Sequence, residues 1–66
     1  MFVLQLYDTD ELTEMKVAGS VGALFTWAIW KLWPANIDTY VCGNITYLRR
    51  DEKEIGIITE IEFIND

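Results

Sequence analysis

The sequence predicts a small α+β domain, in which an antiparallel or mixed sheet of three to four strands carries one helix on one face. Three observations predict this fold. The first residues alternate like a strand, one apolar segment has clear helix boundaries, and the second half is rich in β-branched and aromatic residues around a polar turn. The expected order is a strand, a possible second strand, the helix and two more strands. With 66 residues, the chain has room for one domain, residues 1–66.

The N-terminal segment is predicted to be a strand over residues 2–7, because its apolar residues recur at every second position. Phe2, Leu4 and Leu6 would face the same side of the sheet. Residues 12–18 fit either a short second strand or a helix, and we favour an extended segment.

The helix is predicted to run from Val21 to Leu32 or Trp33. Ser20 is a good N-cap candidate, since its hydroxyl oxygen can accept a hydrogen bond from a free amide of the first turn. Pro34 sets the end, because the residue before a proline is disfavoured in the helical region. The stripe expected to face the sheet consists of Val21, Leu24, Phe25, Ala28 and Leu32.

Residues 39–49 and 54–64 are predicted to form a hairpin around a four-residue loop at 50–53. In this register Arg49 would oppose Glu54, Tyr47 would lie over Gly56, and Ile45 would meet Ile58. The side chains expected to point at the helix are Ile55, Ile57, Ile61 and Phe63. Cys42 would lie on the same core-facing side, as a small buried hydrophobe.

The composition argues against catalysis and against metal or cofactor binding. The chain has no His and a single Cys, Cys42, so it can form neither an intramolecular disulfide nor a four-ligand zinc site nor a nucleophile paired with His. We therefore expect no enzyme activity, no metal and no cofactor. A single free Cys and the lack of a signal-peptide pattern indicate the cytoplasm.

The excess of acidic residues makes some kinds of binding partner less favourable than others. Eleven acidic and five basic residues give a net charge of −6, which disfavours direct binding to nucleic acid. Glu60 and Glu62 would share one strand face and could meet a basic partner, although a simple solvated face explains them as well.

The helix carries more apolar surface than one sheet face can cover. Trp27, Trp30 and Trp33 follow at intervals of three residues, with Ile29 nearby, and lie largely outside the expected core stripe. Tryptophan is enriched at the energetic centres of protein interfaces. This second set predicts an interface with another protein or with a second copy of the chain. In the alternative, the first strand, the segment at 12–18 and the loop at 34–38 wrap around and bury it.

The sequence therefore favours a non-catalytic interaction module, such as a small acidic inhibitor or adaptor of the kind common in phages and mobile elements. It would bind a larger host protein through the tryptophan-rich helix or the acidic face. Homo-oligomerisation is also expected, because a chain this short buries a marginal core by itself.

Two alternatives remain open at this point. The first is an oligomer that binds a small ligand such as a nucleotide, with anion contacts from Gly19, Ser20 and Gly22 at the helix start and from Arg49 and Arg50. The second is a membrane-associated helix, since residues 17–33 form an apolar run that contains only Lys31 as a charge.

Overall fold

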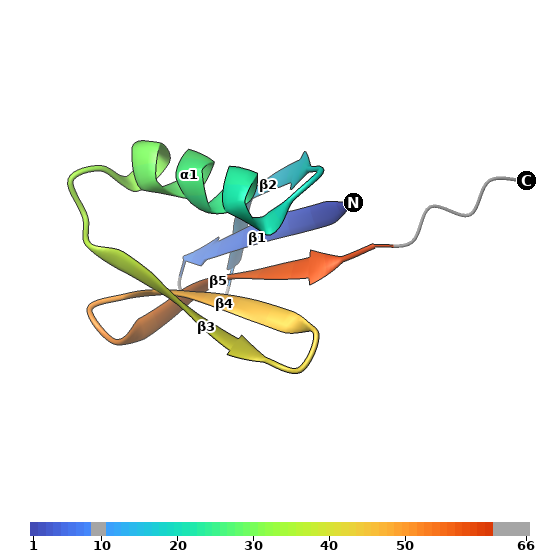
Figure 1. The fold of residues 1–66 in the computed structure, drawn as a ribbon. Coiled ribbons are helices and arrows are strands. Elements are labelled where there is room, and N and C mark those ends of the chain that lie inside the picture. Colours follow the sequence, from blue (N-terminus) through green and yellow to red (C-terminus); the bar gives the residue numbers. More distant parts are fainter. Residues whose placement is uncertain (9–10, 62–66) are drawn as a thin grey trace, which may run out of the picture.

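The computed structural model describes residues 1–8 and 11–61. It contains five strands and one helix in the order ββαβββ (Figure 1). Their bounds are β1 (Phe2–Asp8), β2 (Glu11–Ala18), α1 (Val21–Leu32), β3 (Ile37–Cys42), β4 (Ile45–Arg50) and β5 (Lys53–Glu60). The strands form one antiparallel sheet in the order β2-β1-β5-β4-β3, so the α+β class is confirmed.

The prediction of three to four strands is wrong, because the segment expected to be one strand over 39–49 is a hairpin. Gly43 and Asn44 form a two-residue turn between β3 and β4, with Gly43 at φ +62°. A left-handed turn position of this kind favours glycine. The segment at 12–18, in contrast, is extended within β2, as favoured above.

The second hairpin is tighter than the expected four-residue loop. Arg50 pairs with Lys53, and the two turn residues Asp51 and Glu52 have φ values of 53° and 65°. These positive angles at both central positions match the twist of a tight hairpin turn. The expected pairing of Arg49 with Glu54 is confirmed.

Beyond that pair the predicted register is wrong, because a register shift lies between Leu48 and Arg49. The shift sets Leu48 against Gly56, Tyr47 against Ile57, and Ile45 against Thr59. A shift of one residue exchanges the two faces of a strand. Ile58 therefore lies in the core in place of Ile57.

Two further residues predicted to be buried are exposed, because both lie at or beyond the end of a strand. Cys42 is exposed, since β3 ends there and the two-residue turn follows directly. Ile61 is also exposed, at 37%, beyond the end of β5, whereas Ile55 packs against the core as expected. Phe63 lies outside the described residues.

The core lies between the helix and one face of the sheet. Figure 1 shows α1 above the β1–β2 side of the sheet, well away from the β3–β4 hairpin. The predicted face of β1 is confirmed, and Leu24 and Ala28 of the expected helix stripe are fully buried, while Val21 packs against them. The buried residues are Leu4, Leu6, Leu24, Ala28, Leu48 and Ile58.

Gly56 allows the two halves of the sheet to meet closely. A Cβ atom added to this residue would lie 2.9 Å from the backbone oxygen of Gln5 and 2.9 Å from Cδ2 of Leu6. Since Gly56 pairs with Leu6 on one side and Leu48 on the other, a side chain here would compete with the core for the same space.

Candidate functional site

The helix is held in place at both ends by local features that the sequence predicted. The Oγ of Ser20 accepts a hydrogen bond from the amide of Ala23 at 3.1 Å, so Ser20 is the N-cap. At the other end Trp33 has left the helical region, with ψ 137°, immediately before Pro34. The amide of Ala35 then donates to the carbonyl of Leu32 at 2.8 Å and turns the chain away from the helix.

The structure divides the predicted tryptophan set in two. Trp27 is half-buried and packs against the core, and Ile29 is half-buried as well. Trp30 and Trp33, in contrast, are 75% and 69% exposed. The predicted alternative, in which the surrounding segments bury the whole set, therefore applies in part to Trp27 and Ile29 and not to Trp30 or Trp33.

Trp27 is also covered by charged groups from two elements. The Nζ atoms of Lys16 on β2 and Lys31 on α1 lie 5.6 and 6.0 Å from the centre of its ring. Ammonium groups at this distance are attracted to the negative face of an indole. Glu14 of β2 pairs with Lys31 at 3.1 Å, so the contact ties the helix to the edge strand. Trp27 thus belongs to the fold.

Trp30 and Trp33 form an aromatic pair on the surface, at the C-terminal end of α1. Their ring centres are 6.4 Å apart and the ring planes are inclined by 33°. The pair lies on the side of the molecule that carries the helix, and Lys31 is adjacent in sequence. Two large apolar rings that contact each other in solvent are an unusual surface feature for so small a chain.

The residues considered for anion binding do not come together within one chain. Gly19, Ser20 and Gly22 lie at the helix start, near the paired residues Ala18 and Phe2. Arg49 and Arg50 lie at the opposite end of the sheet, next to the β4–β5 turn.

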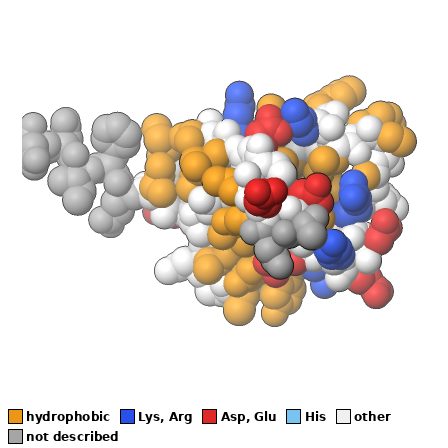
Figure 2. Space-filling model, turned by 180° about the vertical axis from the view of Figure 1, so that it is seen from behind, with side chains coloured by type: hydrophobic (Ala, Val, Ile, Leu, Met, Phe, Trp, Pro, Cys, Tyr) orange, Lys and Arg blue, Asp and Glu red, His pale blue; other side chains and the backbone are white. Residues whose placement is uncertain are grey.

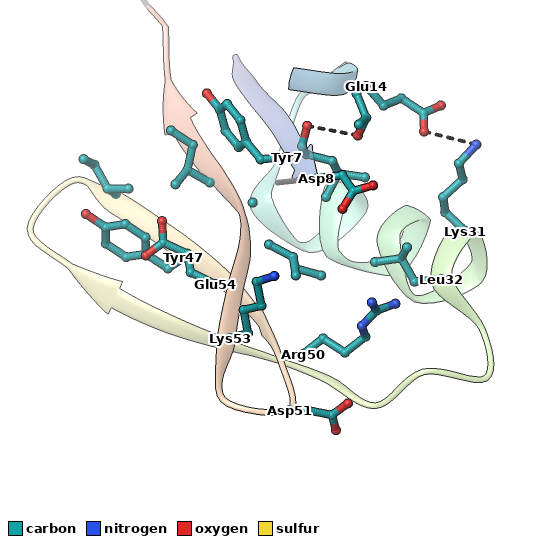
Figure 3. A pocket seen from close by; sticks show the side chains of 16 residues that line it. Tyr7, Asp8, Glu14, Lys31, Leu32, Tyr47, Arg50, Asp51, Lys53 and Glu54 are labelled. Atoms are coloured by element: carbon teal, nitrogen blue, oxygen red, sulfur yellow. Dashed lines mark hydrogen bonds and ion pairs between the residues drawn. The ribbon is translucent and has the colours of Figure 1, made fainter. Parts of the chain in front are cut away.

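Each of these two arginines has other neighbours. Arg49 pairs with Asp38 at 3.0 Å and its guanidinium lies 5.6 Å from the centre of the Tyr40 ring. Arg50 lies close to Leu32 at the C-terminal end of the helix (Figure 3). A cation is favourable there, because the free carbonyl groups of a helix end carry partial negative charge.

An open groove that the sequence did not predict lies where β1 and β5 separate beyond the pair Leu6–Gly56 (Figure 3). Among the described residues it is lined by three basic side chains, Lys31, Arg50 and Lys53, and by four acidic ones, Asp8, Glu14, Asp51 and Glu54. The hydroxyl of Thr13 donates to the carbonyl of Leu6 at 3.2 Å on its wall, beside the register shift between Leu6 and Tyr7. Charges of both signs are mixed, so the groove selects neither anions nor cations. These residues come from β1, β2, α1, β4 and β5, and no sequence spacing could have indicated them.

The acidic face can be described only in part. Glu60 is exposed at the end of β5, where it pairs with Phe2. Glu62 lies outside the described residues.

Several further findings bear on the class of protein. Within residues 1–8 and 11–61, no group of three or more His, Cys, Asp or Glu side chains is placed to hold a metal ion. The helix has 12 residues, hence a length of about 18 Å, and the described part of the chain has no helix that meets the length and apolarity needed to cross a membrane. No protein-family model, curated protein or solved structure matches the chain.

Proposed function

We propose that this protein is a non-catalytic interaction module that binds a larger protein through Trp30 and Trp33. The observation that supports the proposal is the exposure of the two rings, at 75% and 69%, although the chain has few residues with which to build a core. Burying an aromatic side chain stabilises a complex by about 1.5–3 kcal/mol, so two adjacent rings provide a strong anchor.

The partner surface is expected to combine an apolar pocket with a basic rim. The pocket would receive the two indole rings, which contact each other and so form one protruding unit. The basic rim would match the net charge of −6 and would accelerate association at low salt. An inhibitor or adaptor works in this way, by occupying a surface of its target without changing it chemically.

The test compares affinities with a matched pair of variants. Proteins retained from a host lysate by the immobilised chain are identified, purified and titrated by calorimetry. For the true partner, Trp30→Ala combined with Trp33→Ala should weaken the dissociation constant at least tenfold, which corresponds to about 1.4 kcal/mol.

Val41→Ala is the control, because Val41 is similarly exposed, at 65%, but lies on β3 away from the helix. It should leave the dissociation constant unchanged. Near-UV circular dichroism and thermal melting would show that all variants remain folded. Equal affinity of the tryptophan variant and the native chain for every retained protein would refute the proposal.

A further inference from the structure

The sheet face opposite α1 carries two uncharged and largely apolar rows of residues from one edge strand to the other. The ladder registers set five residues side by side across it, namely Val17, Val3, Thr59, Ile45 and Cys42. The neighbouring row on the same face consists of Met15, Gln5, Ile57, Tyr47 and Tyr40. These two rows are called the open face below. They contain no charged residue, in a chain of which 24% is charged.

The open face is not covered by the described part of the chain. Met15 is 54% exposed, Tyr40 52% and Val17 46%. An antiparallel sheet with one face in water normally alternates apolar residues inside with polar residues outside. Here Ile57 and Ile58 are consecutive and point to opposite faces, so β5 is apolar on both sides.

The charges on this side of the sheet gather at one end, next to the open face. Arg49 pairs with Asp38 at 3.0 Å, and Glu54 lies opposite Arg49. Seen from behind, the molecule has hydrophobic side chains next to the end where β5 finishes and along its lower edge, whereas most charged side chains lie toward the opposite end, which also carries a hydrophobic group at its upper corner (Figure 2). Figure 3 shows Tyr7 and Tyr47 on the side of the sheet away from Lys31 and Leu32.

We infer that the open face binds a second copy of this chain, sheet against sheet, to form a symmetric dimer. Each copy has a net charge of −6, so two copies repel each other, and the repulsion is weakest in an arrangement whose contact surfaces carry no charge. The open face is such a surface. In a two-fold contact the same patch is used twice, which sets one uncharged face on another and leaves the carboxylates at the perimeter.

The size of the open face fits a dimer. Residues on one side of a strand repeat about every 6.6 Å, so two rows across five strands about 4.8 Å apart give a plane of roughly 24 by 13 Å. Two copies would cover about 600 Å² of this plane in total, and the relief of the side chains brings the accessible area buried toward about 1,000 Å², the lower limit for a specific interface. The contact would also add a second core to a chain that has only six buried hydrophobic residues among those described.

This inference does not depend on the proposed function, because Trp30 and Trp33 lie on the other side of the sheet, with the helix. A dimer formed through the open face leaves both tryptophan pairs accessible. Loss of the dimer and loss of partner binding can therefore be separated by variants of different residues.

Sedimentation equilibrium of the native chain, from micromolar to millimolar concentration, tests the dimer. The expected mass is twice the 7.7 kDa of one chain. Met15→Lys should raise the dimer dissociation constant at least about 100-fold, because it buries an unpaired charge. Trp30→Lys is the control, since it makes the same change in net charge at a more exposed position, and it should remain dimeric.

Hydroxyl-radical footprinting provides a second measurement that needs no variant. With rising concentration of the native chain, Tyr40 and Met15 should lose their reactivity, whereas Trp30 should keep it. A native chain that stays monomeric at millimolar concentration would overturn the inference. So would a dimer that Met15→Lys leaves intact, or a footprint in which Tyr40 and Met15 react equally at all concentrations.

Discussion

The two faces of the sheet differ less in composition than in what covers them. Ile58 lies under the helix and is 1% exposed, whereas its neighbour Ile57 points to the open face and is only partly buried. Likewise Leu4 is fully buried while Val3 on the opposite side is not. The helix thus covers the β1–β2 side of one apolar face and leaves the opposite face, which differs little in hydrophobicity, without a cover among the described residues. The comparison shows that both faces of the sheet carry apolar side chains, while the helix packs against one face only.

The largest effect on stability should come from truncating a side chain on the sheet face that lies toward the helix, called the covered face below. Ile58→Ala removes a side chain from the core, and the free energy of unfolding should fall by about 2–5 kcal/mol at every protein concentration. Ile57→Ala should cost about 1 kcal/mol in dilute solution, where the open face is wet. Urea denaturation of both variants measures the contrast. Equal costs in dilute solution would contradict the assignment of the two faces.

In concentrated solution, the stability costs of Ile57→Ala and Ile58→Ala should respond differently to protein concentration. If the open face is buried between two copies, the cost of Ile57→Ala should rise with concentration, because association stabilises the folded state by mass action. The cost of Ile58→Ala should stay constant. If the stability cost of Ile57→Ala does not change with protein concentration, the open face is not buried between two copies.

An intermediate effect is expected at Gly56, where the covered face has no spare room. In Gly56→Ala the new methyl group would lie 2.9 Å from the backbone oxygen of Gln5, and the resulting overpacking should cost about 1–3 kcal/mol. Gly22→Ala, whose added Cβ has no atom within 4 Å, is the matched control and should be neutral or slightly stabilising. Thermal melting of the two variants measures the difference.

The smallest effect on stability should come from weakening the N-terminal end of α1, the helix that packs on the covered face. Ser20→Ala removes the N-cap hydrogen bond of α1, so the free energy of unfolding should fall by about 1 kcal/mol. Since the helix lies on the other side of the sheet, the oligomeric mass should not change. Ser20→Asp, which retains a capping oxygen, should restore the stability in the same urea titration.

The local signals in the sequence predicted most of the elements. Ser20 and Pro34 set the helix correctly, because a cap and a proline act on the backbone next to them. The turn at Gly43 and Asn44 was also visible in principle, since Gly-Asn between two β-rich runs is a hairpin signal. The run of β-branched and aromatic residues on both sides of this pair favours one continuous strand over residues 39–49, and the predicted number of strands is therefore too low.

The faces of β5 could not be assigned from the sequence, for a physical reason. Ile55, Ile57 and Ile58 surround a glycine, so the run has no alternation from which to decide which side is buried. The register shift beside Arg49 then reversed the assignment. It depends on how β4 and β5 fit together, which spacing along either strand does not show.

At the candidate site, the spacing of the tryptophans in the sequence likewise does not show which of them are exposed. Trp27, Trp30 and Trp33 have equal spacing, which predicted one continuous surface. Lys16, from a different element, covers Trp27 and separates it from the other two. Only the three-dimensional arrangement makes this distinction, because it depends on the pairing of β2 with β1.

The strand order has a consequence for synthesis of the chain. β5 is the last strand among the described residues, yet it lies between β1 and β4 and joins the two halves of the sheet through Gly56 and Ile58. Until it has left the ribosome, the hairpins β1–β2 and β3–β4 have no strand between them, and Leu4 and Leu48 lack their partners Ile58 and Gly56. The nascent polypeptide therefore cannot close this sheet until β5 has been synthesised, and its unpaired strand edges and apolar side chains stay exposed in that interval.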